Sequence, residues 1–202
     1  MRIRPTIVVT AAGRGSRFGG PLHKLEQPFD GGTLLGATLR RAIESQLPVV
    51  VVTTAALAPL AGRHVATRDI VVLSAGEAAR GIGYSLAAGV AERSGAPGWL
   101  ILPGDMPLVR PGTFLAVATA LEQHPVVCAQ HRGHRGHPVG FAAELYSELI
   151  QLDNDDGVRR VVARYPAHGQ ELRDPGVLLD VDTPADLEAL RKLIGTVQPE
   201  AG

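Results

Sequence analysis

VVTAAGRGSRFG, residues 8–19, is the stretch from which the rest of the chain is interpreted. It begins as a short apolar strand and opens into a glycine-rich loop that carries Arg14 and Arg17, with Lys24 shortly after it. Gly13 and Gly15 lack a Cβ atom, so the backbone N–H groups of the loop can approach a ligand closely, and the three cations can neutralise phosphate oxygens. We interpret the loop as a nucleoside triphosphate site, and a solvated turn with incidental arginines is the less favoured alternative.

Two common glycine-rich loops do not fit this stretch. A dinucleotide-binding fingerprint needs a third glycine where the chain has Phe18, and an acidic residue after the next apolar strand, which ends in Thr53 and Thr54. A Walker A loop needs Ser or Thr after its lysine, whereas Leu25 follows Lys24. The sequence therefore argues against an NAD site and against a P-loop ATPase.

Length and composition predict one soluble domain. The chain has 202 residues, of which 45% are hydrophobic, and we expect a single domain over residues 1–195 with a flexible tail over 196–202. Twenty basic residues balance twenty acidic ones, so no global field favours nucleic acid or a membrane surface. The lone Cys128 lies in an apolar run and no segment is long enough to span a bilayer, which together predict a cytoplasmic protein.

Apolar runs of strand length alternate with helical patterns along the chain. Strands are expected at 7–10, 48–53, 70–73, 99–102, 126–129, 139–141 and 177–181, and helices at 34–46, 84–93, 111–123, 144–152, 158–165 and 184–194. This alternation predicts an α/β fold with a mainly parallel sheet covered by helices. Ligands bind such sheets at the carboxyl ends of the strands, which is where the glycine-rich loop lies.

Acidic residues follow two of the expected strands. Asp105 comes after the apolar run 99–102, and Asp180 and Asp182 lie on one side of an extended segment late in the chain. Magnesium typically takes one or two carboxylates together with nucleotide phosphates, so Asp105 and Asp182 are the candidate ligands. The structural alternatives are that Asp105 caps the next helix, that Asp182 or Thr183 caps the last helix, and that Asp180 has a purely structural role.

Five segments in chain order resemble the MobA-like nucleotidyltransferases, and among them the molybdenum cofactor cytidylyltransferases. They are AAGRGSRFG at 11–19 with Lys24, GIGYSL at 81–86, GDMP at 104–107, GHPV at 136–139 and DTPADL at 182–187. The resemblance extends over nearly the whole chain. It implies a three-layer α/β/α, Rossmann-like fold of the glycosyltransferase-A type, with a mixed and mostly parallel sheet.

The resemblance also implies a role for individual residues. Catalytic roles fall on Lys24, Asp105 and Arg17, and Mg²⁺ on Asp105 and Asp182. Nucleotide binding falls on Ala11, Ala12, Gly13, Arg14, Gly15, Ser16, Lys24, Gly81, Gly83, Ser85 and Gly104. Acceptor binding falls on His137, Pro138 and Asp156. The Ala-Ala-Gly form of the loop resembles cytidylyl enzymes, whereas guanylyl relatives tend to carry a second glycine there.

The activity implied is transfer of CMP from CTP to the phosphate of a molybdopterin-type acceptor, with release of pyrophosphate. A molybdoenzyme that receives the product is a possible partner, and neither nucleic acid nor membrane is expected. The chain departs from the resemblance at 154–159, where NDDGVR replaces the usual Gly-Asp-x-Gly-Ala-Arg, and at 74–80, which lacks the asparagine that relatives often carry. A guanylyl or other nucleotidyltransferase with another phosphorylated acceptor, and a non-catalytic nucleotide-binding module, remain alternatives.

Two further chemistries compete with nucleotidyl transfer. Ser85, Asp105 and His137 follow the chain order of an α/β-hydrolase triad, but a loop precedes Ser85, and we expect this serine to be a helix N-cap instead. His131, His134 and His137 recur every third residue like zinc ligands. No cysteine accompanies them, and the flanking strands predict a turn, so a mobile basic loop is the favoured interpretation.

Overall fold

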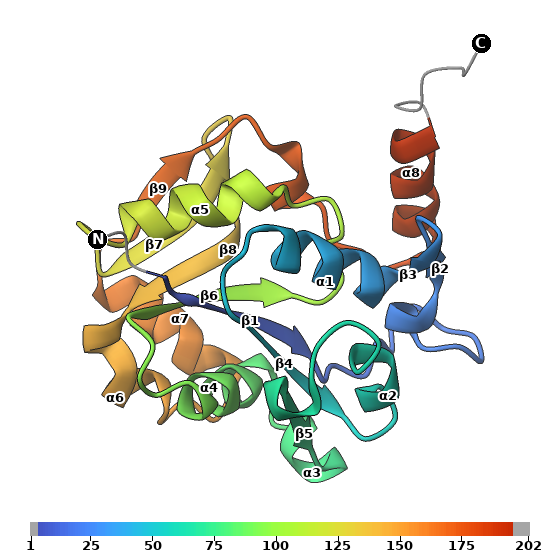
Figure 1. Ribbon diagram of the computed structural model, residues 1–202, viewed down its shortest axis with the longest axis horizontal. Coiled ribbons are helices and arrows are strands. Elements are labelled where there is room, and N and C mark those ends of the chain that lie inside the picture. The colour runs from blue at the N-terminus through green and yellow to red at the C-terminus, as the bar shows by residue number, and fades with distance from the viewer. Residues whose placement is uncertain (1–3, 196–202) are drawn as a thin grey trace.

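A computed structural model describes residues 4–195 of the chain, and the expected tail at 196–202 lies outside the described residues. A seven-stranded sheet lies between two layers of helices (Figure 1). In chain order its strands are β1 (Thr6–Ala11), β4 (Val49–Thr54), β5 (Ile70–Leu73), β6 (Gly98–Pro103), β7 (Val126–His131), β8 (His134–Ala142) and β9 (His168–Glu171). Across the sheet they follow the order β5-β4-β1-β6-β8-β7-β9. A separate small hairpin consists of β2 (Pro28–Phe29) and β3 (Gly32–Thr33).

Strand pairing confirms the predicted mixed, mostly parallel sheet. Parallel pairs join β1 to β4 and to β6, β4 to β5, and β7 to β9. Strand β8 runs antiparallel to both β6 and β7. The three-layer α/β/α fold class expected from the sequence is therefore correct.

Helices cover both faces of the sheet. They are α1 (Leu34–Glu44), α2 (Ala58–Ala61), α3 (Ala75–Ala78), α4 (Ile82–Glu92), α5 (Pro111–Ala120), α6 (Tyr146–Leu149), α7 (Asp155–Arg164) and α8 (Pro184–Gly195). Helices α1 and α5 lie on one face, and α4, α6 and α7 on the other (Figure 1). None of the described helices combines the length and the apolar character that a membrane crossing requires.

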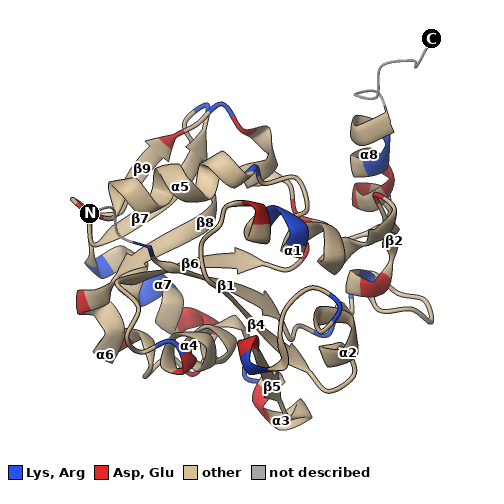
Figure 2. Cartoon of the chain, in the orientation of Figure 1, with Lys and Arg blue, Asp and Glu red and all other residues tan. Residues whose placement is uncertain are grey.

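The two core layers follow from the alternation of side chains along β1. Ile7 and Val9 belong to the layer beneath α1 and α5, whereas Val8 belongs to the layer beneath α4. All three are fully buried, as expected for a central parallel strand with apolar residues on both faces. Basic and acidic residues are interspersed on both helical layers (Figure 2).

One sequence prediction is wrong in this part of the fold. Residues 177–181 form no strand, because Asp174 caps the Gly176 N–H at 3.0 Å and Pro175 begins a 3-10 helix, Pro175–Leu178. The turn predicted within 131–137 is present but shorter than expected: it consists of Arg132 and Gly133, with φ of 51° and 80°, and the residues on either side belong to the β7–β8 hairpin.

Helix α4 packs unusually close to the sheet at Gly89. A Cβ atom on Gly89 would lie 2.4 Å from Val8 Cγ1 and 2.9 Å from Val52 Cγ2. Both valines are fully buried in the sheet and have no room to withdraw. The absence of a side chain at this position therefore sets the distance between α4 and strands β1 and β4.

We predict that Gly89→Ala lowers the free energy of unfolding by about 1–3 kcal/mol, because the added methyl group overpacks this contact. Urea denaturation measures the loss. Gly112→Ala in α5 is the matched control, since no atom lies within 4 Å of its added Cβ. An equal effect of the two substitutions would contradict the packing argument.

Candidate functional site

The carboxyl ends of β1 and β6 lie side by side and bring distant segments together. The Gly104 N–H donates to the Thr10 carbonyl oxygen at 2.9 Å, which ties the loop after β6 to the end of β1. The Val181 N–H in turn donates to the Asp105 carbonyl oxygen at 3.2 Å. The glycine-rich loop, the loop after β6 and the segment before α8 therefore meet at one edge of the sheet.

The glycine-rich loop is held in place by its own backbone and by His23. Gly15 adopts φ of 62°, and its carbonyl oxygen accepts a hydrogen bond from the N–H of the buried Phe18 at 3.0 Å. His23 Nδ1 accepts from the Leu25 N–H at 3.1 Å, so its Nε2 carries the proton and donates to the Gly13 carbonyl oxygen at 2.9 Å. His23 therefore braces the loop, a role that no motif in the sequence indicates.

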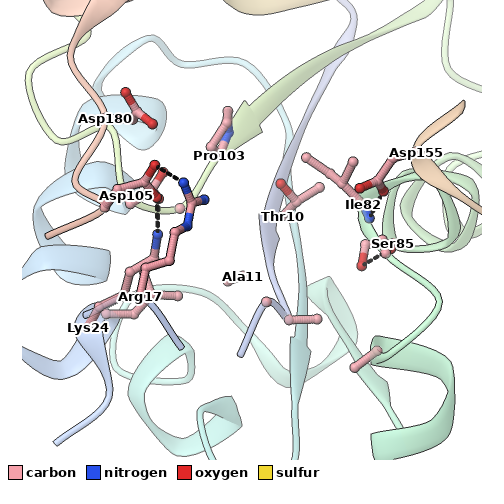
Figure 3. Close-up of a pocket in the computed structure, with 17 residues that line it drawn as sticks. Thr10, Ala11, Arg17, Lys24, Ile82, Ser85, Pro103, Asp105, Asp155 and Asp180 are labelled. Atoms are coloured by element: carbon pink, nitrogen blue, oxygen red, sulfur yellow. Dashed lines mark hydrogen bonds and ion pairs between the residues drawn. The ribbon is translucent and has the colours of Figure 1, made fainter. Parts of the chain in front are cut away.

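Two cations and two carboxylates form an ion cluster beside this loop (Figure 3). Lys24 Nζ lies 2.5 Å from Asp105 Oδ2, 3.4 Å from Asp182 Oδ1 and 3.0 Å from the Val181 carbonyl oxygen. Arg17 Nη1 lies 2.7 Å from Asp182 Oδ2. The side chains of Lys24 and Asp105 are only 13% and 11% exposed, whereas that of Arg17 is 75% exposed. The Lys24–Asp105 pair is thus the buried centre of the cluster.

Asp105 and Asp182 are not helix caps. Asp174 Oδ2 accepts from the Arg110 N–H and the Thr113 hydroxyl at the start of α5, so Asp105 has no capping role there. The Thr183 hydroxyl accepts from the Asp186 N–H at 3.2 Å, as the predicted N-cap of α8 should. Asp105 Oδ1 is buried and has no hydrogen-bond partner among the described residues. Neither carboxylate is therefore engaged in capping a helix, and their bound oxygens are held by Lys24 and Arg17.

The ion cluster lies at one end of a cavity of about 350 Å³. The other end is the N-terminus of α4, with Ile82, Ser85 and Asp155 (Figure 3). Ten of the predicted site residues line this cavity, namely Ala11, Ala12, Gly13, Arg17, Lys24, Gly81, Ser85, Gly104, Asp105 and Asp182. Arg14, Gly15 and Ser16 lie on the adjacent loop without lining the cavity.

Asp155 lines the cavity, whereas Asp156, the neighbour predicted as a site residue, does not. Asp155 Oδ1 accepts from the Ile82 N–H at 2.7 Å and so fastens α7 to the start of α4. Asp156 lies exposed on α7, 3.8 Å from Arg159. Gly83 does not line the cavity either: a Cβ there would lie 2.1 Å from the Asn154 carbonyl oxygen, so its glycine serves the packing of α4 on this segment.

A second cavity of about 420 Å³ adjoins the first, with which it shares Pro103 and Asp180. His137 and Arg135 line it together with Cys128 and a largely apolar set, Met106, Val139, Val162, Val177 and Leu178. Pro138 is buried and does not line it. Burial lowers the pKa of His137, which the nearby Asp105 and Asp180 oppose, and burial raises the pKa of the Cys128 thiol.

The structure contradicts the triad hydrolase alternative. Ser85 is not the N-cap that the sequence predicted; Gly81 is, and Ser85 lies buried inside α4, with its hydroxyl 3.5 Å from the Gly81 carbonyl oxygen. No hydrogen bond among the described residues links Ser85 to His137 or His137 to Asp105, whose Oδ2 is bound by Lys24 instead. A nucleophile elbow at the end of a strand is therefore not formed.

The histidine cluster does not form a zinc site. Within residues 4–195, no group of three or more His, Cys, Asp or Glu side chains is arranged to hold a metal ion. His131 and His134 face each other across the hairpin, and the ring of His131 contacts the Leu172 carbonyl oxygen at 2.7 Å. Protein ligands alone therefore provide no closed metal centre in this part of the chain.

Residues 7–172 match the family of the MobA-like NTP transferase domain. The match includes the glycine-rich loop, Asp105 and the lining of both cavities, except for the lining residues between Val177 and Asp182. The chain belongs to this family. It is a nucleotidyltransferase, and its fold is the glycosyltransferase-A-like fold of its solved neighbours.

Individual relatives of this MobA-like protein carry different names. Molybdenum cofactor cytidylyltransferase of Escherichia coli K12 is 26% identical over 89% of the chain and 91% of that protein. Purine catabolism protein PucB of Bacillus subtilis is 28% identical over 92% and 95%. The crystal structure of Rv0371c from Mycobacterium tuberculosis, 28% identical, has a TM-score of 0.79 over 94% of this chain and 98% of that one, and a further structure of Rv0371c is a complex with manganese.

We predict that His137 makes the folded MobA-like protein less stable at acid pH. The unfolded chain takes up a proton on this histidine as the pH falls through about 6.5, whereas burial lowers the pKa in the folded state. The contribution to stability is therefore complete above this pH and is lost below it. His137→Gln removes this proton uptake. Urea denaturation at pH 7.5 and 5.5 should therefore show that the free energy of unfolding falls less between the two pH values for the variant than for the wild type. An equal fall for both proteins would contradict this role of His137.

Proposed function

We propose that the chain transfers CMP from CTP to the phosphate of a molybdopterin-type acceptor and releases pyrophosphate, with Mg²⁺ as cofactor. The observation that carries this proposal is the ion cluster of Arg17, Lys24, Asp105 and Asp182, which faces the glycine-rich loop within one cavity. Supporting the cytidylyl branch are the Ala11-Ala12-Gly13 form of the loop and the similarity to a cytidylyltransferase.

In this proposal the nucleotide lies along the first cavity with its phosphates at the ion cluster. Backbone groups of Ala11, Ala12 and Gly13 hold the base, and Gly81 and Ser85 frame the far side of the nucleotide. Arg14, Gly15 and Ser16 close over the phosphates from the adjacent loop. Lys24 and Arg17 bind phosphate oxygens and stabilise the pyrophosphate as it leaves, because charge develops there in the transition state.

The residues present fit a divalent cation. Asp105 Oδ1 is a buried carboxylate oxygen without a partner among the described residues, and Asp182 Oδ1 lies within 3.4 Å of the same lysine as Asp105 Oδ2. Hard oxygen ligands of this kind, together with phosphate oxygens, are what Mg²⁺ prefers. When bound, the cation would neutralise charge on the α-phosphate and align it for attack.

The second cavity is the proposed acceptor site. It adjoins the first through Asp180 and Pro103, so an acceptor phosphate at the junction would lie next to the nucleotide. His137 and Arg135 supply polar groups there, and the apolar lining fits a flat heterocyclic body. Pro138 would contribute by shaping the backbone of this wall, whereas the exposed position of Asp156 leaves only a contact from outside the cavity.

A different nucleotide or acceptor is the second candidate function. The relative PucB carries a name from purine catabolism, although it is as similar to the chain as the cytidylyltransferase is. The same ion cluster would serve any nucleoside triphosphate, because it contacts phosphates and not the base. Nucleotide and acceptor therefore have to be tested separately.

We predict that Asp105→Asn lowers pyrophosphate release from CTP and molybdopterin by about a hundredfold, the loss of one preorganised charge contact of roughly 3 kcal/mol. A coupled pyrophosphate assay measures the rate. Asp30→Asn is the control. Asp30 Oδ2 lies 3.3 Å from Arg40 Nη2, and this carboxylate–cation pair lines neither cavity. A fall of less than tenfold for Asp105→Asn would rule out the assigned role.

We also predict that CTP with Mg²⁺ raises the melting temperature more than GTP, ATP or UTP does. A ligand that binds only the folded state stabilises it in proportion to its affinity, and the proposed function gives CTP the highest affinity. The shift should disappear when CTP is replaced by cytidine, which has no phosphates for the ion cluster. A larger shift with GTP would move the chain to the guanylyl branch. Binding of CTP without turnover of molybdopterin would point to a different phosphorylated acceptor.

A further inference from the structure

The protein's own cations occupy the carboxylates that the proposed function assigns to the metal. Lys24 Nζ has three donors and three acceptors around it, on Asp105, Asp182 and Val181, so its hydrogen-bonding capacity is filled. Arg17 takes the remaining oxygen of Asp182 at 2.7 Å. Of the four carboxylate oxygens, Asp105 Oδ1 alone has no partner among the described residues. A divalent cation shared by the two carboxylates would therefore need at least one oxygen of Asp182 that Lys24 or Arg17 now holds.

We propose that Lys24 and Arg17 act as internal counter-ions that keep the carboxylate pair closed until a nucleotide arrives, so that nucleotide and divalent cation load together. This inference rests on the proposed function and adds to it a mode of control. Its basis is competition for the same atoms: Lys24 Nζ contacts Asp105 Oδ2 at 2.5 Å and Asp182 Oδ1 at 3.4 Å.

Charge balance favours joint loading over loading of the metal alone. Two cations neutralise two carboxylates in the cluster, and a divalent cation added by itself would displace Lys24 from a site in which its side chain is only 13% exposed. The displaced ammonium group would lose three partners without gaining any, which is costly in a poorly solvated site. A triphosphate provides new partners for both Lys24 and Arg17.

The ligand set leads to the same conclusion independently. Among the described residues no third carboxylate, histidine or cysteine completes a metal centre with Asp105 and Asp182. Magnesium and manganese sites with one or two carboxylates are usually completed by water and by substrate phosphates. The side chain of Arg17 is 75% exposed, so little buried surface is lost when it leaves Asp182, and the cluster can open when phosphates are present.

Isothermal titration of Mn²⁺ into the nucleotide-free protein tests the proposal, with metal-free CTP titrated separately in EDTA. Lys24→Met removes the competing cation, so Mn²⁺ alone should bind about tenfold more tightly than to the wild type, while metal-free CTP should bind about tenfold more weakly. Arg17→Gln should shift both affinities in the same directions by a smaller factor. Arg40→Gln, which breaks the exposed pair with Asp30, is the matched control and should change neither.

Opposite shifts of the two affinities are the signature of a counter-ion, because loss of a merely structural lysine would weaken both. Unchanged or weaker Mn²⁺ binding by Lys24→Met with a wild-type unfolding transition would overturn the inference. If Lys24→Met does not fold, Arg17→Gln decides in the same way, since Arg17 is mostly exposed. A wild-type protein that binds neither CTP nor Mn²⁺ in any combination would instead sink the proposed function, and the inference with it.

Discussion

The buried ion pair between Lys24 and Asp105 is the interaction on which the site depends. The two residues are 81 positions apart in the chain, and Val181, which accepts the third hydrogen bond of Lys24, comes from a third segment. A lysine and an aspartate that are nearly excluded from solvent are tolerated only when each satisfies the other. The pair therefore fixes the glycine-rich loop, the loop after β6 and the entry to α8 relative to one another.

The sheet makes this pairing possible. Parallel neighbours β1 and β6 end at the same edge, and the hydrogen bond from Gly104 to Thr10 holds the two following loops together. Parallel strands that are apolar on both faces could be recognised in the sequence, and with them the fold class and the edge at which ligands bind. The glycines and cations of residues 11–24 could also be recognised in the sequence, because their chemistry is local.

Features that depend on distant partners were not accessible from the sequence. Strand β9 (His168–Glu171) has the polar sequence HGQE, and only its parallel pairing with β7 at the edge of the sheet makes it a strand. The largely apolar residues 177–181 were predicted as a strand. Asp174, which accepts hydrogen bonds from distant Arg110 and Thr113, instead caps a 3-10 helix that ends at Leu178, and residues 179–181 are irregular. Asp155 and Asp156 are identical neighbours in the sequence, and only the packing of α7 on α4 makes Asp155 the one that binds the Ile82 N–H and lines the cavity.

In the proposed function, two adjoining cavities would allow one fold to serve several acceptors. The first cavity carries the charged cluster, whereas the second is largely apolar and shares with it only Asp180 and Pro103. If the second cavity holds the acceptor as proposed, changes in its apolar lining would alter the acceptor without disturbing Lys24 or Asp105. Relatives with names as different as molybdenum cofactor cytidylyltransferase and purine catabolism protein PucB are consistent with such a division.

The central claim is that carboxylates from two distant segments receive a divalent cation opposite a basic glycine-rich loop. A crystal structure of the protein with CTP and Mn²⁺, with the anomalous scattering of manganese recorded, tests it most directly. We expect an anomalous peak shared by Asp105 and Asp182, with Lys24 and Arg17 moved onto the phosphates. A peak away from these two aspartates, or CTP phosphates outside the ion cluster, would contradict it.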